Sequence, residues 1–157
     1  MVPAADLRPA WWRCVRVLGV DPGGTTGYWM YDRMEPTEVN GQVALEGLPE
    51  RLYSLSELGV GFSCNVVVIE DFALLGGKAL AQIGSKFETC QAIGMFKLWA
   101  YGHGLPVVMQ PPGIKPIATK WSHIKVPSNH RLSHRFDAAL HAVYYQVASA
   151  GEQSVRE

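Results

Sequence analysis

One short segment constrains the fold of this chain more than any other. The run Val66–Ile69 consists only of apolar, β-branched residues and ends at Glu70 and Asp71. Continuous apolar runs of this length are typical of a strand at the centre of a sheet, where helices cover both faces. We therefore expect a sheet between layers of helix, with two acidic side chains at the end of its central strand.

Four further strands are expected around this run. The segment 15–20 is short and β-rich, and it stops at Asp21 and the Pro-Gly-Gly sequence behind it, because proline and glycine interrupt strands. The segment 26–32 is expected to pair with it as a hairpin around that turn. The segments 39–45 and 106–109 can supply a third strand and a last one.

Apolar residues at intervals of three and four predict helices over 47–58, 79–101 and 131–148, with a short helix near 117–122. Helix 79–101 has apolar residues outside its main stripe as well as within it. A helix that is apolar on more than one side needs more than one partner. One face is expected to pack on the sheet, and the second is either buried in the same chain or contacts another subunit. The main stripe is Leu80, Ile83, Phe87, Cys90, Gly94, Leu98 and Tyr101.

The last helix is expected to have an apolar side and a polar side. The apolar side consists of Phe136, Leu140, Val143 and Val147, and the opposite side of His134, Asp137 and His141. Strands come first as a meander and then alternate with helices, which predicts one α/β domain with a mixed five-stranded sheet flanked by helices. The length of 157 residues fits a single domain. We place a loose arm at 1–14, the domain at 15–150 and a frayed tail at 151–157.

The cysteines and the hydropathy indicate where such a protein works. Three cysteines form no Cys-x-x-Cys motif and leave one unpaired, which favours a reducing compartment. No run reaches the roughly 18 apolar residues of a membrane span. We expect a cytoplasmic protein without membrane contact.

The charges are unevenly distributed, although the formal net charge is zero. Residues 1–70 carry five basic and nine acidic side chains, whereas residues 71–157 carry nine basic and five acidic ones. Within 76–135 the basic side chains face Glu88 as the single acid. Such a local basic field attracts a polyanion, although solvated helix faces rich in lysine give the same pattern. The basic residues are Lys78, Lys86, Lys97, Lys115, Lys120, Lys125, Arg131 and Arg135.

Acidic residues stand where predicted elements end. Asp21 follows the first strand, Glu70 ends the central strand, and Asp137 lies on the last helix with His134 one turn before it. Ligands bind beyond strand ends in sheets of this kind, so these side chains are expected to converge if the two strands are neighbours. Carboxylates held together repel one another, and divalent cations relieve the repulsion. Two such ions ~4 Å apart can activate a water and stabilise the leaving oxygen of a phosphodiester.

Three motifs, in this order, resemble the RuvC-type Holliday junction resolvases. Val17–Gly23 with Thr26–Tyr28 resembles their opening strand and turn, Val67–Glu70 their central strand, and His134–Leu140 their last helix in its His-x-x-Asp-Ala form. The resemblance covers about residues 15–148, and the compact chain is similar to phage-encoded members. It implies the RNase H-like (retroviral integrase-type) fold. It also implies a homodimeric crossover junction endodeoxyribonuclease that hydrolyses phosphodiesters of branched DNA by a two-metal-ion mechanism.

The resemblance assigns catalytic roles residue by residue. Asp21, Glu70 and Asp137 would be metal ligands, with His134 as the fourth member of the site. The cofactor would be Mg²⁺ or Mn²⁺, with two ions per active site. Adjacent strand residues point to opposite faces, so either Glu70 or Asp71 enters the site, and the resemblance favours Glu70. Whether Asp71 or His141 also joins the site is left open.

The resemblance also suggests contacts with DNA and with a second subunit. Lys115 would contact the scissile phosphate, and Phe72 would either stack on a base at the junction or serve as a core residue. Helix 79–101 would form the dimer interface. The candidate DNA-binding residues are Phe72, Lys78, Lys86, Lys115, Lys120, Lys125, Arg131 and Arg135.

The sequence leaves alternative functions open. The segment from Asp21 to Thr26 is similar to the first phosphate loop of sugar kinases and actin-like ATPases, but those folds need two such domains and the chain is too short. The serious alternative is another nuclease on the same fold that acts on flaps, forks or single strands, because a fold does not determine a substrate. A non-catalytic DNA-binding domain is the third possibility.

Overall fold

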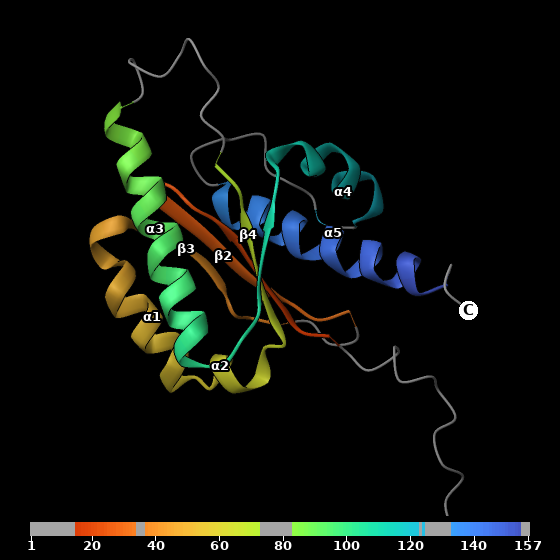
Figure 1. The fold of residues 1–157 in the computed structure, drawn as a ribbon, viewed down its shortest axis with the longest axis horizontal. Helices are drawn as coiled ribbons and strands as arrows, with labels where there is room; N and C mark the ends of the chain where they lie inside the picture. Colours follow the sequence, from red (N-terminus) through yellow and green to blue (C-terminus); the bar gives the residue numbers. More distant parts are fainter. Residues whose placement is uncertain (1–14, 34–36, 73–82, 123, 125–132, 155–157) are drawn as a thin grey trace, which may run out of the picture.

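The computed structural model describes residues 15–33, 37–72, 83–122, 124 and 133–154. Five strands and five α-helices lie in these segments (Figure 1). The strands are β1 (Val17–Asp21), β2 (Thr25–Tyr31), β3 (Asn40–Ala44), β4 (Val66–Glu70) and β5 (Val107–Gln110). The helices are α1 (Leu48–Glu57), α2 (Val60–Ser63), α3 (Ile83–Gly102), α4 (Lys115–Trp121) and α5 (His134–Ser154).

The strands form one mixed sheet in the order β3-β2-β1-β4-β5. β1 and β2, and likewise β2 and β3, are antiparallel, whereas β1 and β4, and β4 and β5, are parallel. The run Val66–Ile69 is buried throughout, as expected for a strand covered on both faces. The fold class predicted from the sequence, a mixed five-stranded sheet flanked by helices, is confirmed.

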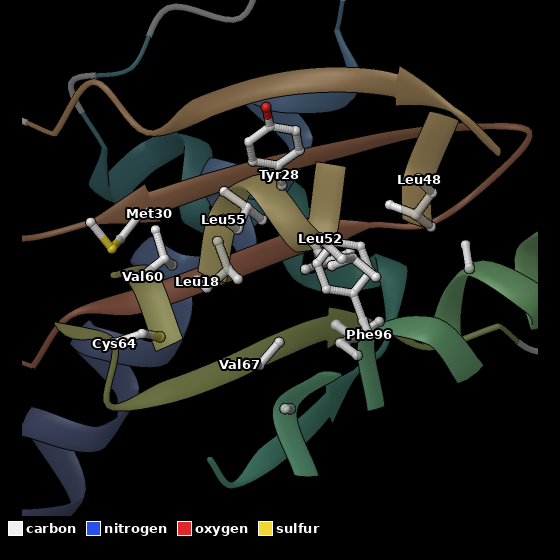
Figure 2. Close-up of a cluster of buried hydrophobic side chains, with 14 residues drawn as sticks. Leu18, Tyr28, Met30, Leu48, Leu52, Leu55, Val60, Cys64, Val67 and Phe96 are labelled. Atoms are coloured by element: carbon white, nitrogen blue, oxygen red, sulfur yellow. The ribbon is translucent and has the colours of Figure 1, made fainter. Parts of the chain in front are cut away.

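Helices cover both faces of this sheet (Figure 1). α1, α2 and α3 lie on one face, while α5 packs on the other against β1 and β2, with α4 beside it. Successive residues of β1 supply the two cores in turn, because side chains alternate along a strand. Figure 2 shows the larger core, which includes Leu18, Tyr28, Leu52, Leu55 and Phe96. The smaller core under α5 consists of Val17, Val66, Val68 and Ala142.

Two glycines let α5 lie directly on the strands. A Cβ at Gly19 of β1 would collide with the backbone carbonyl of Ala138, and one at Gly27 of β2 would collide with the backbone of His134. The helix contributes alanines at this contact, since Ala138 and Ala142 are fully buried. Because Gly19 and Gly27 carry no side chain, the first turn of α5 can lie close to the end of β1.

The sequence prediction for the faces of the last helix was wrong in part. His141 was placed on the polar side, but it is fully buried, and Val147 was placed on the apolar side, but it is 41% exposed. The helix turns its alanines toward the glycine-containing strands, and this rotation carries His141 inward. Leu140 and Val143 are buried as expected. The helix also runs to Ser154, beyond the predicted end at 148.

The sequence prediction also misplaced the packed side of α3. Phe87, Leu98 and Tyr101 of the expected main stripe are 65%, 72% and 83% exposed. The buried side chains of α3 are instead Ala92, Phe96 and Ala100. Phe96 and the two alanines pack into the larger core, so the predicted main stripe faces away from it. The possibility that this stripe is buried within the same chain is excluded for the described side chains.

Other expectations fall partly outside the described residues. These are the loose arm predicted at 1–14, the first residues of the long predicted helix at 79–82, and the end of the predicted tail at 155–157. No helix in the described part is long and apolar enough to cross a membrane. Cys64 and Cys90 are free thiols, the first buried and the second exposed.

Candidate active site

The carboxyl ends of β1 and β4 place two acidic residues side by side. These strands are parallel, with Val20 opposite Ile69, so Asp21 and Glu70 follow at the same edge of the sheet. Asp21 is buried, Glu70 is half-buried and Asp71 is exposed. The structure therefore brings together the first two carboxylates that the sequence suggested. Glu70, and not the exposed Asp71, lies beside Asp21.

The first turn of α5 adds a histidine and a third carboxylate. His134 lies with its Nδ1 2.7 Å from Asp21 Oδ2. Asp137 follows three residues later, still within the first turn of the helix, where the helix dipole favours a negative charge. The contact between Gly27 and the backbone of His134 holds this turn against β2. The close packing of α5 on the strands thus delivers both side chains to the strand ends.

Lys115 occupies the centre of the acidic group. Its Nζ lies 2.6 Å from Glu70 Oε2, 3.1 Å from Asp137 Oδ2 and 3.7 Å from Asp21 Oδ1. The residue begins α4, which follows β5 after a short turn. One ammonium group therefore compensates three carboxylates that come from β1, β4 and α5.

The ligand chemistry of this group suits a divalent cation. Carboxylate oxygens are the ligands that Mg²⁺ and Mn²⁺ prefer, and three of them already converge on a single positive charge. Within the segments that the structure describes, no group of three or more His, Cys, Asp or Glu side chains is arranged to hold a metal ion as it stands. The ammonium of Lys115 lies among the carboxylates instead.

The pKa values of Asp21 and His134 are both raised from their ordinary values. Burial raises the pKa of Asp21, and the hydrogen bond with His134 and the charge of Lys115 offset only part of this effect. The hydrogen bond with Asp21 raises the pKa of His134, against a smaller opposing effect of burial. The buried carboxylate is therefore costly to keep charged, and it depends on nearby positive charge.

Glu70 and Lys115 stabilise each other's charged forms. Burial alone would raise the pKa of Glu70, but hydrogen bonds from His141 and Lys115 outweigh it and hold that pKa below its ordinary value. Burial would lower the pKa of Lys115, but Asp21 and Glu70 raise it to about 12. Glu70 and Lys115 are therefore both charged at neutral pH.

His141 is a site residue whose role the sequence left open. Its Nε2 lies 2.8 Å from Glu70 Oε2 and its Nδ1 lies 2.9 Å from Gln110 Oε1. The sequence contained one signal of its position, because His141 falls on the same helical side as His134 and Asp137. That pattern was interpreted as a polar outer side, whereas the buried imidazole contacts Glu70 from beneath.

The other predicted DNA contacts are less closely tied to this group. Phe72 is half-buried just beyond Glu70, and its backbone N–H donates to Asp71 Oδ1. Lys120 is exposed on α4, and Arg135 is exposed with its guanidinium 4.9 Å from the ring centre of Phe136. The side chains of Lys78, Lys86, Lys125 and Arg131 lie outside the described part of the structure.

Comparisons with known proteins were informative at the level of structure. No family model matches the chain, and no curated protein matches it. Among solved structures, Thermus thermophilus RuvC in complex with a Holliday junction substrate superposes with a TM-score of 0.63 at 18% identity, covering 87% of this chain and 96% of that one. A second Thermus thermophilus RuvC structure gives a TM-score of 0.56 at 18% identity, covering 86% and 96%.

These similarities extend over nearly the whole length of both chains. They show that the chain has the fold of RuvC and confirm the RNase H-like fold that the sequence motifs implied. At this level of identity the likeness concerns the fold, and a fold hosts many activities. The activity therefore depends on the side chains at the strand ends.

Proposed function

We propose that the chain is a metal-dependent endonuclease that cleaves phosphodiesters of branched DNA and resolves four-way junctions. One observation carries the proposal. Carboxylates from β1, β4 and α5 converge with Lys115 at one edge of the sheet, in a chain with the RuvC fold. A similar structure is described as bound to a Holliday junction substrate, which favours this substrate class.

The residues that would hold the cofactor are Asp21, Glu70, Asp137 and His134. Mg²⁺ or Mn²⁺ bound there, as two ions per site, would supply activation of a water and stabilisation of the leaving oxygen. The chain's own residues prepare the site for this charge. Asp21 is buried with a raised pKa, and Glu70 is held ionised. A positive charge therefore stabilises these carboxylates more than it would stabilise exposed ones.

Lys115 is proposed to contact the scissile phosphate. Its ammonium lies among the three carboxylates, and a cation that entered the site would compete with it for the same oxygens. A lysine displaced only slightly from this point would remain close to the reacting phosphate and could pair with it. Further DNA contacts around the site are proposed for Phe72, Lys120 and Arg135.

We propose that the protein works in the cytoplasm, a reducing compartment in which free thiols such as Cys64 and Cys90 persist.

The proposed function is tested with a panel of DNA substrates. Purified protein with Mg²⁺ or Mn²⁺ is expected to introduce nicks in a synthetic four-way junction faster than in a flap, a replication fork, a single strand or a linear duplex. Denaturing gels of end-labelled strands measure each rate. Equal or faster cutting of flaps and forks would favour the broader nuclease, and binding without cutting of any substrate would favour a non-catalytic DNA-binding domain.

We further propose that the chain acts as a homodimer through the exposed face of α3. Phe87, Leu98 and Tyr101 form an apolar stripe on this helix, and Gly94 lies within it with nothing near the position of a Cβ. Exposed apolar patches of this kind are typical of protein interfaces. Two active sites in one dimer would suit the symmetric cleavage of two strands.

Replacing Leu98 by Arg is expected to disrupt this dimer. Each residue occurs twice in a two-fold symmetric interface. Losing the burial of two leucines is therefore expected to weaken association by about 100-fold. Light scattering at micromolar concentration should give twice the 17.3 kDa chain mass for the unmodified protein and the single mass for the variant. Val147→Arg, on α5 across the sheet, is the control and should remain dimeric. A monomeric unmodified protein would contradict the proposal.

A further inference from the structure

Two buried polar side chains, Gln110 of β5 and His141 of α5, connect the interior of the fold to Glu70. Gln110 ends β5 directly opposite Glu70 of β4, and both stand at the edge of the sheet that carries the acidic group. His141 of α5 lies between them and contacts both, with no exposed surface of its own. Gln110 is only 6% exposed. His141 and Gln110 therefore lie beneath the active site and are shielded from solvent.

Packing alone does not account for a histidine at this position. The buried neighbours of His141 along α5 are Ala138, Leu140 and Ala142, which contribute only apolar surface. A buried imidazole costs free energy unless both of its nitrogens are hydrogen-bonded. Here Nε2 faces the Glu70 carboxylate and Nδ1 faces the Gln110 amide, which can turn its –NH₂ toward Nδ1 as a donor. The two partners come from neighbouring strands. The arrangement connects the interior of the fold to one atom of the active site.

That atom is Oε2 of Glu70. It receives contacts from His141 Nε2 at 2.8 Å and from Lys115 Nζ at 2.6 Å. A carboxylate only accepts hydrogen bonds, so the Nε2 hydrogen of His141 points at Oε2. The two contacts differ in permanence, because Lys115 is 24% exposed on a flexible stem whereas the ring of His141 is enclosed. His141 is therefore the contact that remains when the ammonium moves.

We propose that His141, held by Gln110, is a positioning residue that fixes the Glu70 carboxylate for binding a divalent cation. The inference rests on the proposed function, because it assigns to Glu70 the role of a metal ligand. A carboxylate held in one orientation before the cation arrives loses less conformational freedom on binding. Side chains that orient metal ligands from behind typically change metal affinity by 10–100-fold when removed.

The test separates the two contacts of His141 by substitution. His141→Gln can place an amide N–H near the former Nε2 and keep the contact with Glu70. His141→Asn can keep only the contact with Gln110, and His141→Leu keeps neither. Mn²⁺ affinity is measured by isothermal titration calorimetry without DNA. Far-ultraviolet circular dichroism and urea unfolding, measured in EDTA, establish that each variant is folded.

Mn²⁺ is expected to bind His141→Leu and His141→Asn 10–100-fold more weakly than the unmodified protein, while His141→Gln stays within about threefold of it. Folded His141→Leu with unchanged affinity would overturn the inference. If His141→Leu does not fold, equal affinities of the Gln and Asn variants would overturn it. An unmodified protein that binds Mn²⁺ but cuts no DNA would overturn the proposed function alone. One that does not bind Mn²⁺ would overturn both proposals.

Discussion

Replacing Asp21 by Asn should slow junction cleavage by about a thousandfold or more while the protein remains folded. The carboxylate is one of three that converge at the strand ends, and removing it removes a charged ligand from the proposed metal site. Metal ions contribute several kcal/mol to stabilising such transition states, and about 4 kcal/mol corresponds to a thousandfold in rate. Glu70→Gln is expected to behave in the same way.

Asp21→Asn should lose activity without losing stability. The pKa of Asp21 is raised by burial, so the ionised carboxylate destabilises the metal-free fold at pH values above its ordinary pKa. Asparagine removes that charge and keeps an oxygen that can accept from His134. Unfolding of Asp21→Asn in urea, without metal at neutral pH, should therefore require no less denaturant than the unmodified protein.

The matched control is Asp71→Asn. Asp71 is exposed, and its Oδ1 accepts a hydrogen bond from the Phe72 N–H, which asparagine can also do. This variant loses one negative charge near the site but none of the converging ligands, so its initial cleavage rate on a labelled junction should stay close to normal. If Asp21→Asn cuts as fast as Asp71→Asn, the assignment of the active site is wrong.

The sequence predicted the sheet well because its strands carry local signals. Val66–Ile69 has no polar position to expose, and the Pro-Gly-Gly sequence after Asp21 ends β1 at one place. With β1 and β4 as parallel neighbours, the meeting of Asp21 and Glu70 follows from strand geometry alone. These residues were predictable because each depends on its own short segment.

The helix faces were not predictable in the same way. α5 packs through alanines onto Gly19 and Gly27, so the contact depends on small residues that carry little hydropathy. A search for large apolar side chains therefore oriented the helix incorrectly and placed His141 on the outside. On α3 the core-facing side consists of Ala92, Phe96 and Ala100, so one large residue between two small ones faces the core in place of the predicted stripe. Close backbone approach is a property of two segments together, and neither segment shows it alone.

Lys115 shows a different limit. The family resemblance suggested a phosphate contact for it, but the three carboxylates around its ammonium could be recognised only from the assembled fold. Because its pKa is raised to about 12, it contributes stability at every pH below the ordinary lysine value, and that contribution is lost only as the pH rises toward 12. In the absence of metal it is the cation that permits the acidic group to exist.

Lys115→Met should therefore destabilise the metal-free protein by about 2–3 kcal/mol. Breaking a buried ion pair costs about 3–5 kcal/mol, and the 24% exposure of Lys115 reduces this through solvent screening. Methionine preserves much of the apolar stem, so the loss reports mainly the charge. The remaining carboxylates repel one another and are expected to bind a divalent cation more tightly than in the unmodified protein, where the ammonium competes for them.

Urea unfolding in EDTA and in millimolar MgCl₂ checks both parts of this expectation. A ligand that binds only the folded state adds stability in proportion to the logarithm of its concentration over its dissociation constant. The variant should gain more from Mg²⁺ than the unmodified protein, so the difference in unfolding free energy should shrink. Lys120→Met, an exposed lysine on the same helix, should change stability by less than about 0.5 kcal/mol in either buffer. A stability difference of the same size with and without Mg²⁺ would show that the cation and Lys115 do not share the three carboxylates.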